Sequence, residues 1–166
     1  MLIALFTAVA LATGPYAIVL GVAQDAGHPQ AGCTADHCSG AWVDATKRHH
    51  PASLGLVSGD DFYLIDATPA FPDQLHTMQV ISEGAHLKGI FLTHGHMGHY
   101  TGLAHLGREV MGAQQIPVFA MPRMAALLTN NAPWELLVRL NNIHIRPLSA
   151  NAAVELGDLR VTPLRV

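Results

Sequence analysis

Three histidines lie close together in the segment LTHGHMGHYTGL, residues 92–103. His94 and His96 are two residues apart, so an extended backbone directs both imidazoles to the same side. His99 follows three residues later and comes within reach if the chain turns at an intervening glycine. Imidazole nitrogen is a common zinc ligand, and a catalytic zinc usually takes three protein ligands plus water. The spacing therefore predicts a metal site, the alternative being loop histidines that are solvated or hydrogen-bonded to backbone.

The composition indicates one folded domain. The chain has 166 residues, of which 50% are apolar and 13% charged, and this excludes a disordered protein. The net charge is −3 and no run of Lys or Arg occurs, so there is no footprint for nucleic acid. Eleven histidines favour metal or acid–base chemistry. We expect a small-molecule substrate as the partner.

The first twelve residues, MLIALFTAVALA, form an apolar run that is too short to span a bilayer. The run could be the hydrophobic region of a signal peptide, with Ala10-Leu11-Ala12 as the cleavage site. Against this, no Lys or Arg precedes Lys47, so the usual basic region is missing. We predict a signal peptide or an N-terminal apolar segment at residues 1–14. Export would make the protein periplasmic or secreted; otherwise it is cytoplasmic.

Strand and helix patterns alternate along the rest of the chain. Ligand-bearing loops in such α/β or α+β folds lie at the carboxyl ends of strands, where the histidine segment falls. The first strand reads as fully buried and the segment after it, residues 24–42, as a loop. The expected strands are 16–23, two strands around a turn within 53–69, 87–92 and 116–121, and residues 143–166 are predicted to form strands with a tight hairpin turn at Gly157-Asp158. The expected helices are 71–84, 102–111, 122–128 and 134–140.

The segment FLTHGHMGHYTGL, with YLIDATP upstream, resembles the metallo-β-lactamase superfamily. The signature of that family is His-x-His-x-Asp-His after a strand, preceded by a strand that ends in Asp. The resemblance implies an α+β fold, the four-layer αββα sandwich, and residues 15–166 match its first half plus the start of the second. It also implies a zinc hydrolase, in which metal-bound hydroxide attacks an ester, amide or phosphodiester bond.

The resemblance also implies roles for individual residues. His94 and His96 would bind the first metal and His99 would support it or a second one, with zinc or another divalent ion in one or two sites. Asp66 would orient the ligands, the alternative being a turn former or helix N-cap. Tyr100 could reach a substrate oxygen, and hydrogen-bonded packing is the alternative for this side chain.

The sequence departs from the signature at Gly98, where the family has an aspartate. Either the site is mononuclear, or another acid replaces the missing one. Asp25 and His28, on the loop after the first strand, are candidates, and a plain turn is the alternative for both.

The stretch LGVAQDAGHPQAGCTADHC resembles the branch of the superfamily that contains phosphodiesterases and the B-type proteins of pyrroloquinoline-quinone biosynthesis. There, three cysteines hold a structural zinc. Cys33 and Cys38 match the outer two, but Ala35 stands at the middle position. A disulfide, free thiols and a partial zinc site supplemented by His37 all stay open.

The family's downstream metal ligands have no counterpart in the chain. Only His105 and His144 follow His99, and neither fits the motif, so we expect the chain to be a fragment. Two rival functions follow. One is a non-catalytic metal-binding or accessory protein of cofactor biosynthesis with the same fold. The other is a half-domain that needs a partner chain, such as a homo-oligomer formed through an exposed sheet face.

Overall fold

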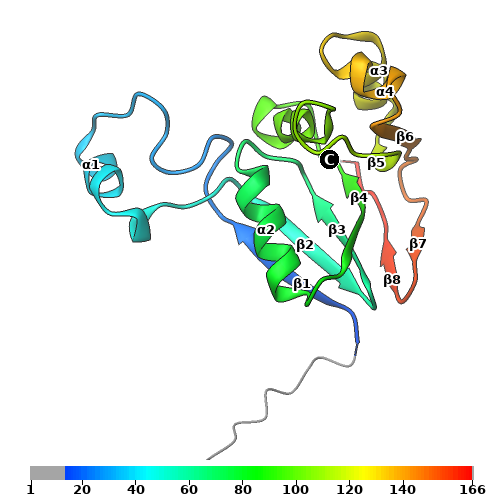
Figure 1. Cartoon of the computed structure of the whole chain (residues 1–166), viewed down its shortest axis with the longest axis horizontal. Helices are drawn as coiled ribbons and strands as arrows, with labels where there is room; N and C mark the ends of the chain where they lie inside the picture. Colours follow the sequence, from blue (N-terminus) through cyan, green and yellow to red (C-terminus); the bar gives the residue numbers. More distant parts are fainter. Residues whose placement is uncertain (1–13, 166) are drawn as a thin grey trace, which may run out of the picture.

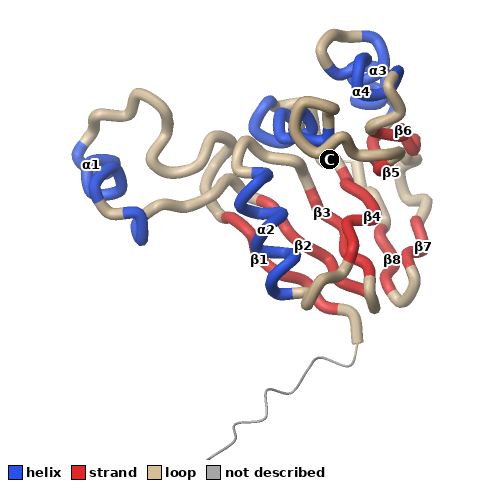
Figure 2. The backbone as a smooth tube through the Cα atoms, in the orientation of Figure 1, coloured by secondary structure: helices blue, strands red, loops and turns tan. Residues whose placement is uncertain are grey.

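A six-stranded sheet forms the centre of the computed structural model, which describes residues 14–165 (Figures 1 and 2). The strands lie in chain order, with β1, β2 and β3 antiparallel and β3 to β6 parallel. A separate hairpin, β7–β8, follows. The strands are β1 Tyr16–Gly21, β2 Ser53–Ser58, β3 Asp61–Ile65, β4 His86–Phe91, β5 Ile116–Ala120, β6 Ile143–Pro147, β7 Val154–Leu156 and β8 Leu159–Val161.

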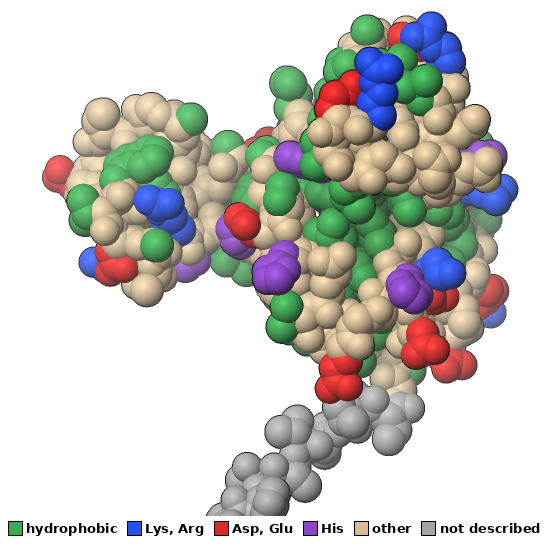
Figure 3. All heavy atoms as spheres, in the orientation of Figure 1, with side chains coloured by type: hydrophobic (Ala, Val, Ile, Leu, Met, Phe, Trp, Pro, Cys, Tyr) green, Lys and Arg blue, Asp and Glu red, His purple; other side chains and the backbone are tan. Residues whose placement is uncertain are grey.

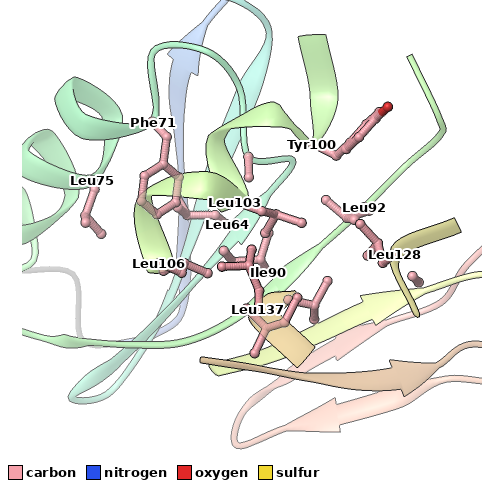
Figure 4. Close-up of a cluster of buried hydrophobic side chains, with 14 of the residues drawn as sticks. Leu64, Phe71, Leu75, Ile90, Leu92, Tyr100, Leu103, Leu106, Leu128 and Leu137 are labelled. Atoms are coloured by element: carbon pink, nitrogen blue, oxygen red, sulfur yellow. The ribbon is translucent and has the colours of Figure 1, made fainter. Parts of the chain in front are cut away.

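Helices connect the parallel strands and cover one face of the sheet (Figures 1 and 4). Each parallel pair needs a crossover connection, and helical segments supply it. The helices are α1 Asp36–Val43, α2 Phe71–Ile81, α3 Pro122–Asn130 and α4 Trp134–Arg139, with 3-10 turns η1 Ala45–Lys47, η2 Met97–His99 and η3 Thr101–Leu106.

Neighbouring residues of the strands face two different cores. In β3, Phe62 and Leu64 point to the helices, whereas Tyr63 points to the face covered by the β7–β8 hairpin. In β4, Ile90 and Phe91 divide in the same way. Because side chains alternate along a strand, these apolar runs require cover on both faces. The order helix layer, sheet and second-sheet hairpin agrees with the predicted first half plus start of the second half.

The hairpin covers only part of its face. Val19 is 64% exposed and Leu54 is 38% exposed, so the part formed by β1 and β2 is open. Within residues 14–165, strand β1 pairs only with β2 and lies at the sheet edge, and most of its residues are exposed or half-buried, so the prediction of a fully buried first strand was wrong. Association of copies through this open face stays a prediction.

An arm, residues 22–52, extends from the body between β1 and β2 (Figures 1 and 3). Backbone hydrogen bonds join His28 and His49 in both directions and close its base. The arm contains α1, so the prediction of a loop over 24–42 was wrong for this part. Helix α1 buries only Cys38 and Ala41, so it lacks the apolar stripe by which helices are usually found.

Two helix predictions needed correction. The helix predicted at 102–111 is the 3-10 segment η3 followed by turns, with Gly102 packed so closely on Thr68 and Phe71 that a side chain would not fit. Helix α2 ends at Ile81, and Val80 on its predicted apolar side is 63% exposed. No helix in the described part is long and apolar enough to cross a membrane. The predicted signal segment lies outside the described residues except for Gly14.

The contact between β2 and α2 predicts a strong effect of Gly55→Ala. The new Cβ would fall 2.6 Å from Met78 Cε, and Met78 is fully buried. We expect a loss of about 1–3 kcal/mol in the free energy of unfolding, measured in urea. The control is Gly40→Ala on helix α1, where the new Cβ meets only the Lys47 side chain, at 3.5 Å or more, and this variant should be neutral or stabilising. Equal stability of the two variants would contradict this packing.

Candidate metal centre

The candidate site lies at the carboxyl ends of β3 and β4, where two loops leave the sheet side by side. Asp66 follows β3 directly, and the histidine segment follows β4. The loops are joined by backbone hydrogen bonds from Asp66 N to Phe91 O (2.7 Å) and from Ala67 N to His99 O (2.9 Å). Parallel strands end at a common edge, so this topology brings residues distant in sequence together.

Asp66 is the buried organiser of the site. Its residue is 4% exposed and its φ is 68°, a left-handed conformation that Asp tolerates better than most residues. Its carboxylate accepts hydrogen bonds from Thr93 N (2.8 Å), Thr93 Oγ1 (2.8 Å) and His99 Nδ1 (2.7 Å). Three donors satisfy a carboxylate that burial would otherwise destabilise by several kcal/mol.

This network also fixes the orientation of His94. The Thr93 hydroxyl donates its single proton to Asp66, so it can only accept from His94 Nδ1, which lies 2.9 Å away. The proton of His94 is therefore on Nδ1. Asp66 thus holds His99 directly and His94 through Thr93, which leaves the Nε2 atom of His94 free to bind an ion.

The three histidine rings form one cluster. The ring centroids of His94 and His99 are 4.0 Å apart, and those of His94 and His96 are 4.6 Å apart. His99 is held inside, with 12% of its side chain exposed, whereas the His96 side chain is 72% exposed. The sequence prediction that these residues converge agrees with this geometry, although their binding of a metal stays a prediction.

Asp25 supplies a carboxylate at the place where Gly98 offers none. Asp25 Oδ1 lies 3.2 Å from His99 Nε2, and Oδ2 lies 3.6 Å from His96 Nδ1. Gly98 is buried against the Asp25 backbone, and a Cβ added there would fall 2.6 Å from Asp25 Cα. The loop that brings Asp25 to the histidines therefore takes the space of a side chain at position 98.

The charges of the site shift its titration. Burial opposes the charged form of His99, but the hydrogen bonds and charges of Asp66 and Asp25 outweigh burial and raise the pKa of His99. Burial, together with the neighbouring His99 and His96, lowers the pKa of His94. The hydrogen bond from His99 lowers the pKa of Asp25. The site therefore contains one imidazole, His99, that binds its second proton more tightly than usual, and another, His94, that binds it less tightly.

The donor set fits a divalent ion in chemistry, since imidazole nitrogen and carboxylate oxygen both bind zinc. The donor atoms of these histidines and Asp25 do not yet converge on one point. Among the described residues, three potential donor atoms come within 4.8 Å of one another only at Cys33, His37 and Cys38, in the arm. Closing the histidine set on one ion needs side-chain rotation, which the exposure of His96 allows.

The other predicted site residues lie elsewhere. Cys33 and Cys38 form a disulfide, one of the alternatives left open by the sequence, with His37 Nε2 3.8 Å from Cys33 Sγ. Tyr100 is buried with the core residues (Figure 4). Its ring packs edge-on against Trp134, with ring centroids 5.2 Å apart. His28 stacks with His37 and His49 in the arm rather than joining the site.

Two residues of the site were not singled out from the sequence. Thr93, between the strand end and His94, could have been noticed as a hydroxyl at the boundary of a ligand loop. Arg123 lines a cavity that also touches His94. Arg123 could have been noticed from its position in the sequence, because it follows the end of β5, at the same sheet edge as the histidine segment.

Comparison with known proteins agrees with this fold. Residues 62–166 match the Beta-lactamase superfamily domain. The chain belongs to the β-lactamase superfamily. The curated relatives include coenzyme PQQ synthesis protein B of Xanthomonas oryzae pv. oryzae, 30% identical over 157 residues, covering 90% of this chain and 51% of that protein. The protein of the same name from Klebsiella pneumoniae is 31% identical over 96 residues, covering 53% of this chain and 31% of that protein.

Solved structures of the superfamily show the same fold. Zn²⁺-bound PqqB from Methylobacterium extorquens superposes with a TM-score of 0.73 at 22% identity, covering 90% of this chain and 55% of that one. A diphosphatase of the PhnP family superposes with a TM-score of 0.63 at 24% identity, covering 86% of this chain and 53% of that one. The chain thus spans about half the length of these relatives. The predicted superfamily and its metallo-β-lactamase fold are confirmed. The predicted signal peptide and export gain no support from these relatives.

The contact of Gly98 with Asp25 predicts that Gly98→Ala disrupts the site. The added Cβ would meet the Asp25 backbone, so we expect a loss of about 1–3 kcal/mol in the free energy of unfolding. Gly98→Asp, which restores the family's aspartate, should lower the free energy of unfolding by at least as much. Gly95→Ala is the control in the same loop, because its Cβ would only contact Met124 Sδ at 3.8 Å. If Gly98→Ala left the free energy of unfolding unchanged, Asp25 would not occupy this position.

The hydrogen bond between Asp66 and His99 predicts a pH dependence in the metal-free protein. We expect His99 to titrate above pH about 6.5 and His94 below it, followed by NMR of the ring protons. Asp66→Asn should lower the pKa of His99, whereas Asp60→Asn, on a distant turn, should not.

The sign for stability follows from the raised pKa of His99. The ion pair stabilises the folded protein fully below pH about 6.5 and is lost as pH rises through the folded pKa of His99. The difference in unfolding free energy between wild type and Asp66→Asn should therefore shrink with rising pH. A difference that grows with pH would exclude this pairing.

Proposed function

We propose that the protein is a metal-dependent hydrolase whose ion, zinc in the first instance, is held by His94, His96 and His99 with Asp25. The observation that carries this proposal is the position of the Asp25 carboxylate, which contacts two of the three histidines. It provides an anionic donor that the histidine segment itself lacks. The proposal concerns the site in this chain, which spans about half of its relatives.

Each residue has a defined part in this proposal. When bound, zinc supplies Lewis acidity that polarises the scissile ester, amide or phosphodiester bond and activates water. His94 and His99 are oriented by Asp66, which keeps their Nδ1 protons in place. Asp25 would supply the anionic oxygen ligand at the open side of the cluster, where its side chain is 40% exposed. Tyr100 has no step here, because its ring lies in the core.

A second candidate is a non-catalytic accessory protein of the same fold. It is favoured by the relatives described above, which are named for coenzyme PQQ synthesis. Such a protein would bind metal or a biosynthetic compound at this site without hydrolysing it. Turnover by the zinc-loaded protein separates the two candidates.

The proposal is tested by zinc binding and hydrolysis together. We expect one equivalent of zinc by elemental analysis, and Asp25→Asn should weaken its affinity about tenfold to a hundredfold. Asp60→Asn is the control for a lost surface carboxylate. Zinc-dependent hydrolysis of bis(4-nitrophenyl) phosphate or 4-nitrophenyl acetate, absent after chelation and restored by zinc, would support the enzyme.

Two results would count against the proposal. Unchanged zinc stoichiometry and affinity in Asp25→Asn would remove Asp25 from the site. Zinc binding without turnover would favour the accessory function.

A further inference from the structure

A cavity of about 340 Å³ opens beside the histidine cluster. His94 forms part of its wall, and the opposite wall is built by the first turns of α3. This volume falls at the lower end of the range of small-molecule sites, about 300–1,000 Å³. The side chains on the wall opposite His94 are Met121, Arg123, Met124 and Leu127.

The wall of the cavity is apolar and adaptable. Met121, Met124 and Leu127 supply most of it, and methionine side chains adjust to ligands of different shape. Thr93, His94 and Gly95 line the same cavity, so the cavity adjoins the His94 ring directly. A ligand can therefore extend from the histidine cluster into this cavity.

One end of the cavity is positively charged. Arg123 is exposed and forms no ion pair with any described residue, and no acidic side chain lines the cavity in the described part of the chain. Arg123 lies in the first turn of α3, whose N-cap, Met121, provides no side-chain acceptor for the free N–H groups. An arginine beside an uncapped helix start favours a carboxylate or phosphate.

We propose that this cavity binds the part of the substrate remote from the reacting bond, a compact apolar group that ends in a carboxylate or phosphate. The assignment of the ligand as substrate rests on the function proposed above. The binding of an apolar anion in the cavity does not depend on that function. Arg123 is then the residue that selects anionic over neutral substrates. The apolar wall selects a short alkyl or aryl body.

The test uses NMR of the metal-free protein with ¹³C-labelled methionine methyl groups, so that no metal ion can attract the ligand. The probes are hexanoate, butyl phosphate and the neutral hexan-1-ol. We expect the Met121 and Met124 signals, assigned through leucine substitutions, to shift with all three probes. At least one of the anions should saturate them at a lower concentration than hexan-1-ol. Met78, a fully buried residue of α2, serves as the internal reference.

Arg123→Gln should weaken binding of the preferred anion about threefold to tenfold and leave hexan-1-ol unchanged. Arg139→Gln, an exposed arginine on α4 that pairs with Glu135, is the matched control. Comparison of hexanoate with butyl phosphate shows which anion the site prefers. Unmoved Met121 and Met124 signals, or equal anion binding in wild type and Arg123→Gln, would overturn the proposal.

These outcomes are separate from those of the proposed function. Binding of anions without zinc-dependent hydrolysis would leave the cavity assignment standing and remove the enzyme. Zinc-dependent hydrolysis without Arg123-dependent anion binding would support the enzyme and remove the cavity assignment.

Discussion

The buried carboxylate of Asp66 is the interaction on which the candidate centre depends. A carboxylate at 4% exposure is stable only when its oxygens are satisfied, and the backbone of Thr93, its hydroxyl and His99 provide this. The same hydrogen bonds fix two imidazoles in place. Satisfying one buried charge therefore also determines the tautomers of the residues that would hold an ion.

The parallel part of the sheet explains why these groups meet. Strands β3, β4 and β5 end at a common edge, and their following residues include Asp66, the histidine segment and the start of α3. The apolar residues inside the strands build two cores, one under the helices and one under the β7–β8 hairpin. The apolar packing of the two cores thus lies in the strands, whereas the polar groups of the site lie in the segments that follow them.

The parts predicted from the sequence are those with local patterns. The order of strands and helices followed from apolar periodicity and turn residues, and the site followed from the spacing of His94, His96 and His99. The superfamily resemblance added Asp66. Asp25 was only one of several options, because its contact with His99 spans 74 residues and depends on the path of the arm. No local pattern encodes such a path.

Other errors have physical causes of the same kind. The position of β1 at the sheet edge depends on strand pairing rather than on its own residues, and η3 is shaped by the close approach of Gly102 to Thr68. The cavity at Arg123 forms where the histidine loop faces the start of α3, and an isolated Pro-Arg pair in the sequence does not reveal this. Tertiary contacts, rather than propensities, decided each of these cases.

The arm that carries Asp25 also sets where the chain can change in length. Asp25 lies between the end of β1 and the paired residues His28 and His49, which close the base of the arm. Insertions or deletions near α1, beyond this closure, would leave the carboxylate where it is. A single residue added between Gly21 and Asp25 would move it off the histidines. Length variation in evolution should therefore concentrate at the tip of the arm and spare its root.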